Sequence, residues 1–110
     1  MTIGIYSSEY LIRHSIIDFF RNENENAEKI SDYMDMYLSK YDLIIVDLDS
    51  IGIEDFIAIS NKSFSKFIVL ASQLNLSDIE KLKKAKVTNI IMKPFNYKTF
   101  KEKVNKVLKK

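Results

Sequence analysis

Two short apolar runs of the chain end in charged side chains that could do chemistry together. The run Leu43-Ile44-Ile45-Val46 is followed directly by Asp47, and Ile90-Ile91-Met92 is followed by Lys93 and by Pro94, the only proline. Apolar runs rich in β-branched residues are typical of strands that are buried on both faces of a parallel sheet. Ligands of such sheets bind at the carboxyl ends of the strands. We therefore expect Asp47 and Lys93 to form one small charged site on neighbouring strand ends.

The elements that position this site alternate along the chain. Apolar and capping patterns predict strands over 2–6, 28–30, 43–46, 67–71 and 88–92, and helices over 9–21, 32–39, 54–60, 78–84 and 98–110. Ser31, Ser77 and Asn96 are the expected helix N-caps. Strands that alternate with helices predict a doubly wound α/β fold with right-handed crossovers. With 110 residues, the chain is long enough for one domain, 1–110.

Composition excludes several classes of protein. The chain has no cysteine, so disulfide frameworks, thiolate zinc sites and cysteine nucleophiles are ruled out. No apolar stretch approaches the roughly 18 residues of a membrane span, and the first residues lack the pattern of a signal peptide. We expect a cytoplasmic protein. Neither a nucleophile–base pair nor a cofactor-binding loop is present, which disfavours an ordinary metabolic enzyme.

Charge is unevenly distributed along the chain, whose net charge is +2. The segment 76–110 carries 11 lysines against three acidic residues, while the preceding segment is net acidic. Lysines on the outer faces of two helices explain this pattern by solvation alone. A basic face that binds nucleic acid or an acidic partner is the alternative.

The residues that end the strands resemble those of the receiver domain of bacterial two-component response regulators, the CheY-like family. The resemblance rests on the run that ends at Asp47, the run Phe67-Ile68-Val69-Leu70, Lys93-Pro94-Phe95 and the terminal helix. It implies a flavodoxin-like five-stranded sheet in the order 2-1-3-4-5. It also implies that Asp47 is the phosphoacceptor position, that Lys93 contacts the phosphoryl group or pairs with Asp47, and that the Lys93-Pro94 bond is cis.

Other positions depart from the family pattern and suggest an atypical member. Where the family has its paired acids after the first strand, this chain has Ser7 and Ser8. The phosphoryl-binding hydroxyl position is Ala71, and the switch aromatic position is Ile90. Two nearby side chains are expected to point away from the site, Glu9 and Ser72.

These departures weaken the case for magnesium and for phosphorylation. Asp47 and Asp49 are the carboxylates that could still bind Mg²⁺, and affinity falls with the number of charged ligands. We expect weak Mg²⁺ binding at most, no other cofactor, and weak or absent phosphorylation of Asp47 by a histidine kinase. An ion pair between Asp47 and Lys93 is expected in its place.

Two functions follow as alternatives. The first is an atypical receiver that regulates transcription through a homodimer or a docked partner, using the face of helix 78–84, strand 88–92 and helix 98–110. Ile79, Leu82 and Ala85 would form its apolar patch, and DNA would be bound only by an output domain outside this chain. The second is a module that works without phosphorylation and binds protein or nucleic acid through its basic C-terminal face.

Overall fold

The computed structural model describes residues 1–38 and 40–108, which form a parallel sheet between layers of helices. Its strands lie in the order β2-β1-β3-β4-β5, so the doubly wound fold that the sequence predicts is confirmed. All four strand pairs are parallel. The strands are β1 (Thr2–Tyr6), β2 (Asn26–Lys29), β3 (Leu43–Asp47), β4 (Lys66–Ala71) and β5 (Ile90–Met92).

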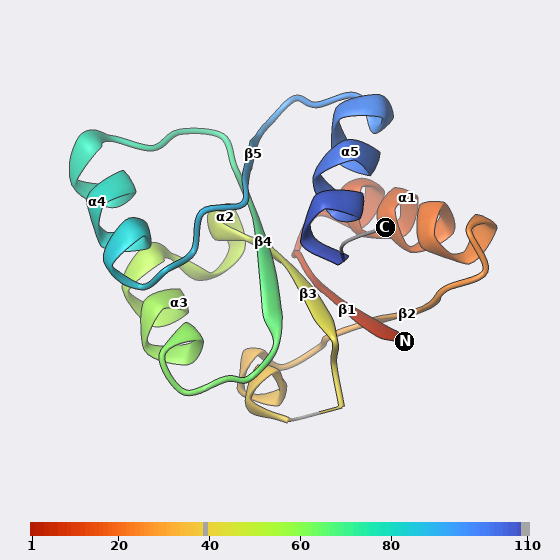
Figure 1. The fold of residues 1–110 in the computed structure, drawn as a ribbon, viewed down its shortest axis with the longest axis horizontal. Coiled ribbons are helices and arrows are strands. Elements are labelled where there is room, and N and C mark those ends of the chain that lie inside the picture. Colours follow the sequence, from red (N-terminus) through yellow and green to blue (C-terminus); the bar gives the residue numbers. More distant parts are fainter. Residues whose placement is uncertain (39, 109–110) are drawn as a thin grey trace.

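Helices cover both faces of this sheet. In Figure 1, α1 and α5 lie on one side of it and α3 and α4 on the other. The helices are α1 (Tyr10–Asn22), α2 (Leu48–Ile51), α3 (Ile53–Ser60), α4 (Leu76–Lys84) and α5 (Tyr97–Leu108). Within the described ranges, none is long and apolar enough to cross a bilayer. The predicted end of the last helix, at 109–110, lies outside the described residues.

The helix predicted over 32–39 is instead a short 3₁₀ helix, η1 (Tyr33–Tyr37), within the part of that range that the structure describes. Its N-cap is Asp32, whose carboxylate accepts a hydrogen bond from the Met34 N–H at 2.9 Å, and not Ser31. Only Met36 of this segment is buried. A segment that buries one side chain has too little packing energy to sustain several α-helical turns.

Helix caps explain where the last two helices begin. The predicted cap Ser77 is wrong, because Asn75 caps α4. The Asn75 side chain accepts a hydrogen bond from the Asp78 N–H at 2.8 Å, and the Asp78 carboxylate accepts one from the Asn75 N–H, which makes a capping box. The Asn96 cap is confirmed, since its Oδ1 accepts a hydrogen bond from the Thr99 N–H at 2.8 Å.

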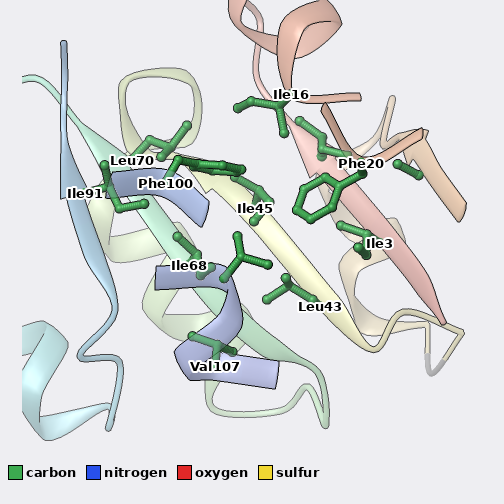
Figure 2. Packing of buried hydrophobic residues seen from close by; sticks show 13 residues of the cluster. Ile3, Ile16, Phe20, Leu43, Ile45, Ile68, Leu70, Ile91, Phe100 and Val107 are labelled. Carbon is green, nitrogen blue, oxygen red and sulfur yellow. The ribbon is translucent and has the colours of Figure 1, made fainter. Parts of the chain in front are cut away.

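Alternation along the strands creates two cores. On β3, Leu43 and Ile45 face α1 and α5, whereas Ile44 and Val46 face α3 and α4. All four side chains are fully buried, as expected for a strand in the middle of a parallel sheet. Figure 2 shows how side chains of α1 and α5, among them Phe20 and Phe100, pack on the first of these faces.

Candidate functional site

The same alternation places three polar side chains on the face that carries α1 and α5. Ser7 follows Ile3 and Ile5, Asp47 follows Leu43 and Ile45, and Lys93 follows Ile91, each at a spacing of two. β1 and β3 are adjacent, with Tyr6 opposite Val46, so Ser7 comes next to Asp47. All three residues lie at the carboxyl ends of their strands, the edge where the sequence predicts a site.

Asp47 is enclosed by partners from three segments. Its Oδ2 accepts a hydrogen bond from the Ser7 hydroxyl at 2.8 Å, and its Oδ1 accepts one from the Asp49 N–H at 3.1 Å. The ammonium of Lys93 lies 2.9 Å from Oδ1 and 3.0 Å from Oδ2. Asp47 exposes 0% of its surface and Ser7 exposes 5%. The carboxylate therefore has hydrogen bonds on both oxygens and no contact with solvent.

Lys93 reaches Asp47 from a strand that is not its neighbour. β4 lies between β3 and β5, with Leu70 opposite both Asp47 and Ile91. The expectation of neighbouring strand ends is thus wrong, and the long lysine side chain spans the end of β4. Phe95, two residues after Lys93, stacks on Phe100 of α5 with ring centroids 5.5 Å apart and helps to fix this loop.

Three carboxylates converge on the Lys93 ammonium. Besides Asp47, its Nζ lies 2.8 Å from Asp49 Oδ2 and 3.2 Å from Glu9 Oε1. Burial disfavours the charged form of Lys93, but the hydrogen bonds to Asp49, Asp47 and Glu9 outweigh it and raise the pKa of this lysine. Hydrogen bonds from Lys93 and then from Ser72 lower the pKa of Asp49. Lys93 and Asp49 are therefore both charged near neutral pH.

Glu9 and Ser72, which are predicted to point away from the site, belong to it. Glu9 is the N-cap of α1 and has an extended backbone, with φ −81° and ψ 108°, which turns its carboxylate toward Lys93. Ser72 follows the last residue of β4, and its hydroxyl donates to Asp49 Oδ2 at 2.5 Å. Ser72 follows Leu70 and Glu9 follows Ser7 at a spacing of two, so both continue the alternation on the face that carries α1 and α5.

The remaining predicted positions do not contact Asp47. The Ser8 hydroxyl lies 3.0 Å from the Ser50 hydroxyl, and the Ser8 N–H donates to the same oxygen at 2.8 Å. Ala71 is fully buried in the core on the α3 and α4 side, and Ile90 packs against that core. These two positions therefore contribute packing to the second core and no polar group to the site.

This arrangement does not fit a magnesium site. The described residues contain no group of three acidic or histidine side chains placed to hold a metal ion. Glu9, Asp47 and Asp49 converge on an ammonium, which stands where a cation would neutralise them. Ser7 adds a neutral hydroxyl that is already used as a donor to Asp47. Mg²⁺ favours charged oxygen ligands in octahedral geometry, so binding it would require Lys93 to leave.

A cavity of about 420 Å³ lies on the outer side of Lys93, between the start of α1 and the loop after β5. Leu11, Ile12, Phe95 and Tyr97 give it an apolar lining. Lys93 and Glu9 border it, but Asp47 does not. Solvent in this cavity therefore meets the ammonium of Lys93 and is separated from the carboxylate behind it.

The predicted exposed patch on α4 is wrong for one of its three residues. Leu82, expected in an exposed patch with Ile79 and Ala85, exposes 0% of its surface and belongs to the core on the α3 side of the sheet. Ala85 is half-buried against the same core. Of the three, only Ile79 is exposed. The hydrophobic face of α4 thus packs inward, as an amphipathic helix on a sheet does.

No family model matches this sequence, and no curated protein does. The fold, in contrast, is similar to many solved structures. A response regulator from Thermotoga maritima superposes with a TM-score of 0.80 at 19% identity, over 99% of this chain and 98% of that one. A two-component response regulator from Clostridium difficile gives 0.84 at 16%, over 100% and 97%.

A third structure points the same way. The response regulator receiver domain protein (CheY-like) from Methanospirillum hungatei has a TM-score of 0.84 and 19% identity, and the match covers 98% of this chain and 93% of that chain. These matches cover nearly the whole of this chain and of each matched chain. The chain has the fold of the CheY-like receiver domains of response regulators.

Proposed function

We propose that this chain is an atypical receiver module in cytoplasmic two-component-type signalling, whose output does not depend on phosphorylation of Asp47. The observation that carries the proposal is the closure of Asp47. Both of its oxygens accept hydrogen bonds, and none of its surface is exposed. A phosphodonor needs a free carboxylate oxygen in line with the phosphorus atom, and charge on the phosphoryl oxygens must be neutralised.

Electrostatics support the same conclusion. The site holds three carboxylates and one ammonium, so its side chains carry a net charge of about −2 by the usual ionisation states. A phosphoryl group would bring further negative charge into a buried position. Mg²⁺ would offset it, but its place is taken by Lys93, which is tied to Glu9, Asp47 and Asp49. The closed ion cluster is therefore the resting state and is costly to open.

The test is exposure of the purified protein to acetyl phosphate or phosphoramidate with Mg²⁺, followed by intact-mass measurement. The expected result is no stable addition of one phosphoryl group. The variant K93A, which opens the carboxylate, serves as a comparison, and D47N removes the acceptor. A near-complete phosphoryl addition to the wild-type protein that D47N abolishes would contradict the proposal.

We propose that the chain transmits its signal by binding a partner protein or a second copy of itself. A separate output domain would then regulate transcription. The docking face is proposed on α4, β5 and α5, where Ile79 and Met92 are exposed by 37% and 45%. Leu82 plays no part in it. Light scattering after size exclusion tests the dimer, with the variants I79D and M92D as probes. A monomer at high protein concentration would overturn the dimer form of the proposal.

The second candidate is a binding module that uses the basic face. Most lysines on α4 and α5 form no ion pair with another described residue, which favours this candidate, because ammonium groups on a surface attract phosphate backbones. A gel shift with duplex DNA at several salt concentrations tests this candidate. A shift that weakens steeply with salt would favour it over the receiver, and no shift at low salt would exclude it.

A further inference from the structure

A second cavity, of about 500 Å³, lies at the opposite end of the sheet from Asp47. Lys66 begins β4, and Thr88 and Asn89 directly precede β5, so the cavity opens at the amino ends of these two strands. The ends of α3, α4 and α5 complete its walls. Its volume is within the range of pockets that hold small organic ligands, roughly 300–1,000 Å³.

Positive charge distinguishes this cavity. Three lysines line it, Lys66, Lys86 and Lys106, and none of the described residues that line it is acidic. None of the three forms an ion pair with another described residue. Lys66 donates one hydrogen bond, to the Val107 carbonyl at 3.3 Å. The cavity therefore gathers three ammonium groups that have no anionic partner within the described chain.

Lysines are favoured near helix C-termini, because the helix dipole places partial negative charge there. The charge of the helix ends at this cavity can be compared with the charge of the three lysines. Each helix end carries about half a negative charge at most, and three helices end at the cavity. Three full positive charges exceed the sum of those partial charges, so the cavity stays net positive. The helix ends alone do not account for all three lysines.

Lys86 adds a conformational observation. Its φ is 62°, in the left-handed region that favours glycine or asparagine. It ends α4 in a Schellman motif, in which the Lys86 N–H donates to the Lys83 carbonyl and the Val87 N–H donates to the Leu82 carbonyl. The equivalent position after α1 is filled by Asn24, also with a φ of 62°. A lysine thus stands at a backbone position that disfavours it, and its side chain borders the cavity.

The rest of the lining suits an organic group. Phe67, Val87 and Val107 contribute apolar surface, and the exposed Thr88 hydroxyl can donate or accept a hydrogen bond. Inorganic phosphate alone would leave most of the volume unfilled. We propose that this cavity binds a small organic phosphate, with its phosphate on Lys66, Lys86 and Lys106 and its organic part over Phe67 and Val107.

The experiment is a titration of the ¹⁵N-labelled protein with ATP, with adenosine as the phosphate-free counterpart. ATP is expected to shift amide signals in 60–67 and 85–89 and at 106–107, and to leave those of Ser7, Asp47 and Lys93 unchanged. Adenosine is expected to produce no comparable shifts. The double variant K86Q/K106Q should raise the Kd for ATP at least about tenfold, because two charge-assisted hydrogen bonds are lost.

The matched control is K29Q/K98Q, which removes the same charge from two exposed lysines outside the cavity. It is expected to change the Kd less than about twofold, which separates a local site from general attraction. In the variant K86G, glycine adopts the left-handed backbone conformation at this position without strain. This variant should remain folded and bind ATP more weakly, because it lacks the ammonium group. An equal loss of ATP affinity in K86Q/K106Q and K29Q/K98Q would overturn the proposal, as would the absence of ATP binding to the wild type.

A parallel titration with a short DNA duplex separates the two sources of phosphate. If duplex binds, ATP does not, and K86Q/K106Q abolishes the binding, the phosphate comes from nucleic acid and the assignment to a small molecule is wrong. If ATP binds in the wild type and is lost in K86Q/K106Q, the assignment holds. The outcome does not depend on whether Asp47 is phosphorylated.

Discussion

The ammonium of Lys93 lies 2.9 Å from one carboxylate oxygen of Asp47 and 3.0 Å from the other, so a single cation covers both. Ser7 and the backbone of Asp49 donate the remaining hydrogen bonds. The pair links the end of β3 to the end of β5 across β4. The pair therefore stabilises the contact between the two strand ends and also shields the carboxylate from solvent.

The variant K93M should be markedly less stable than the wild type. It leaves the carboxylate of Asp47 buried without a cation, and breaking one side of a buried pair costs about 3 kcal/mol. Urea unfolding measures the loss, and K98M, at an exposed lysine, should stay within about 0.5 kcal/mol of the wild type. K93M/D47N should recover part of the loss. A K93M variant no less stable than K98M would show that the pair contributes nothing.

The two serines after β1 should differ in their contribution to stability. S7A removes a buried donor to Asp47 and should cost about 1–2 kcal/mol of unfolding free energy. Ser8 is exposed, so S8A should cost about 0.5 kcal/mol or less. Thermal and urea unfolding of both variants provide the measurement. Equal effects would mean that the hydrogen bond from Ser7 to Asp47 is not a stabilising one.

Adding carboxylates at these serines should create a dependence on magnesium. S7D/S8D places more negative charge beside Asp47, so the variant should be less stable than the wild type without metal. Mg²⁺ should then restore part of its stability by binding the folded state. The wild-type midpoint of unfolding should be unchanged by Mg²⁺. A wild-type midpoint that rises with Mg²⁺ concentration would contradict the poor fit of the site to the metal.

Acid titration should reveal the partners of Asp49. Hydrogen bonds from Lys93 and Ser72 hold its pKa below the ordinary 3.8, so its ionised form favours folding. That contribution is complete above the pKa of the unfolded chain and is lost as pH falls through the lower, folded pKa. S72A should raise the pKa of Asp49, and K93M should raise it further, as measured by ¹³C NMR of the carboxyl group. A wild-type pKa at or above 3.8 would contradict the predicted network.

At alkaline pH, the stability of the protein should depend on the ionisation of Lys93, and this contribution should fall as pH rises. Its folded pKa lies above the ordinary 10.5, so the stability from its charge is complete below pH 10.5 and is lost as pH rises further. The wild type should therefore lose stability above that pH by more than K93M does. Urea unfolding at a series of alkaline pH values gives the comparison. Parallel curves for the two proteins would show that Lys93 is not stabilised by its carboxylates.

Much of the fold could be predicted because the strands carry strong signals. The unbroken apolar run at 43–46 is typical of a strand buried on both faces, and the resemblance to receiver domains implied its place in the middle of the sheet. The segment at 32–39 was harder, since its aromatic residues mimic a helical stripe although only Met36 is buried. Leu82 shows the same limit, because a helical spacing does not say which face meets the core.

The candidate site was predictable only where strand geometry applies. Asp47 and Lys93 come together because Asp47 ends β3, Lys93 directly follows β5, and both lie on the same face of the sheet. Ser72 is predicted outside the site only because Ala71 is taken as the position that faces it, whereas Leu70 lies on the site face and Ala71 on the other. Glu9 lies two residues after Ser7 and caps α1, and a single sequence does not show that the cap brings its carboxylate to Lys93. The signal that could have identified these two site residues is a polar side chain within three positions of a strand end.

The closure of Asp47 is tested most directly by adding Mg²⁺ and beryllofluoride, a mimic of the phosphoryl group, to the ¹⁵N-labelled protein. An enclosed carboxylate that is paired with Lys93 should not bind the mimic, so the amide spectrum should be unchanged around Ser7, Asp47, Ser72 and Lys93. Saturable shifts at these residues that disappear in D47N would contradict the account.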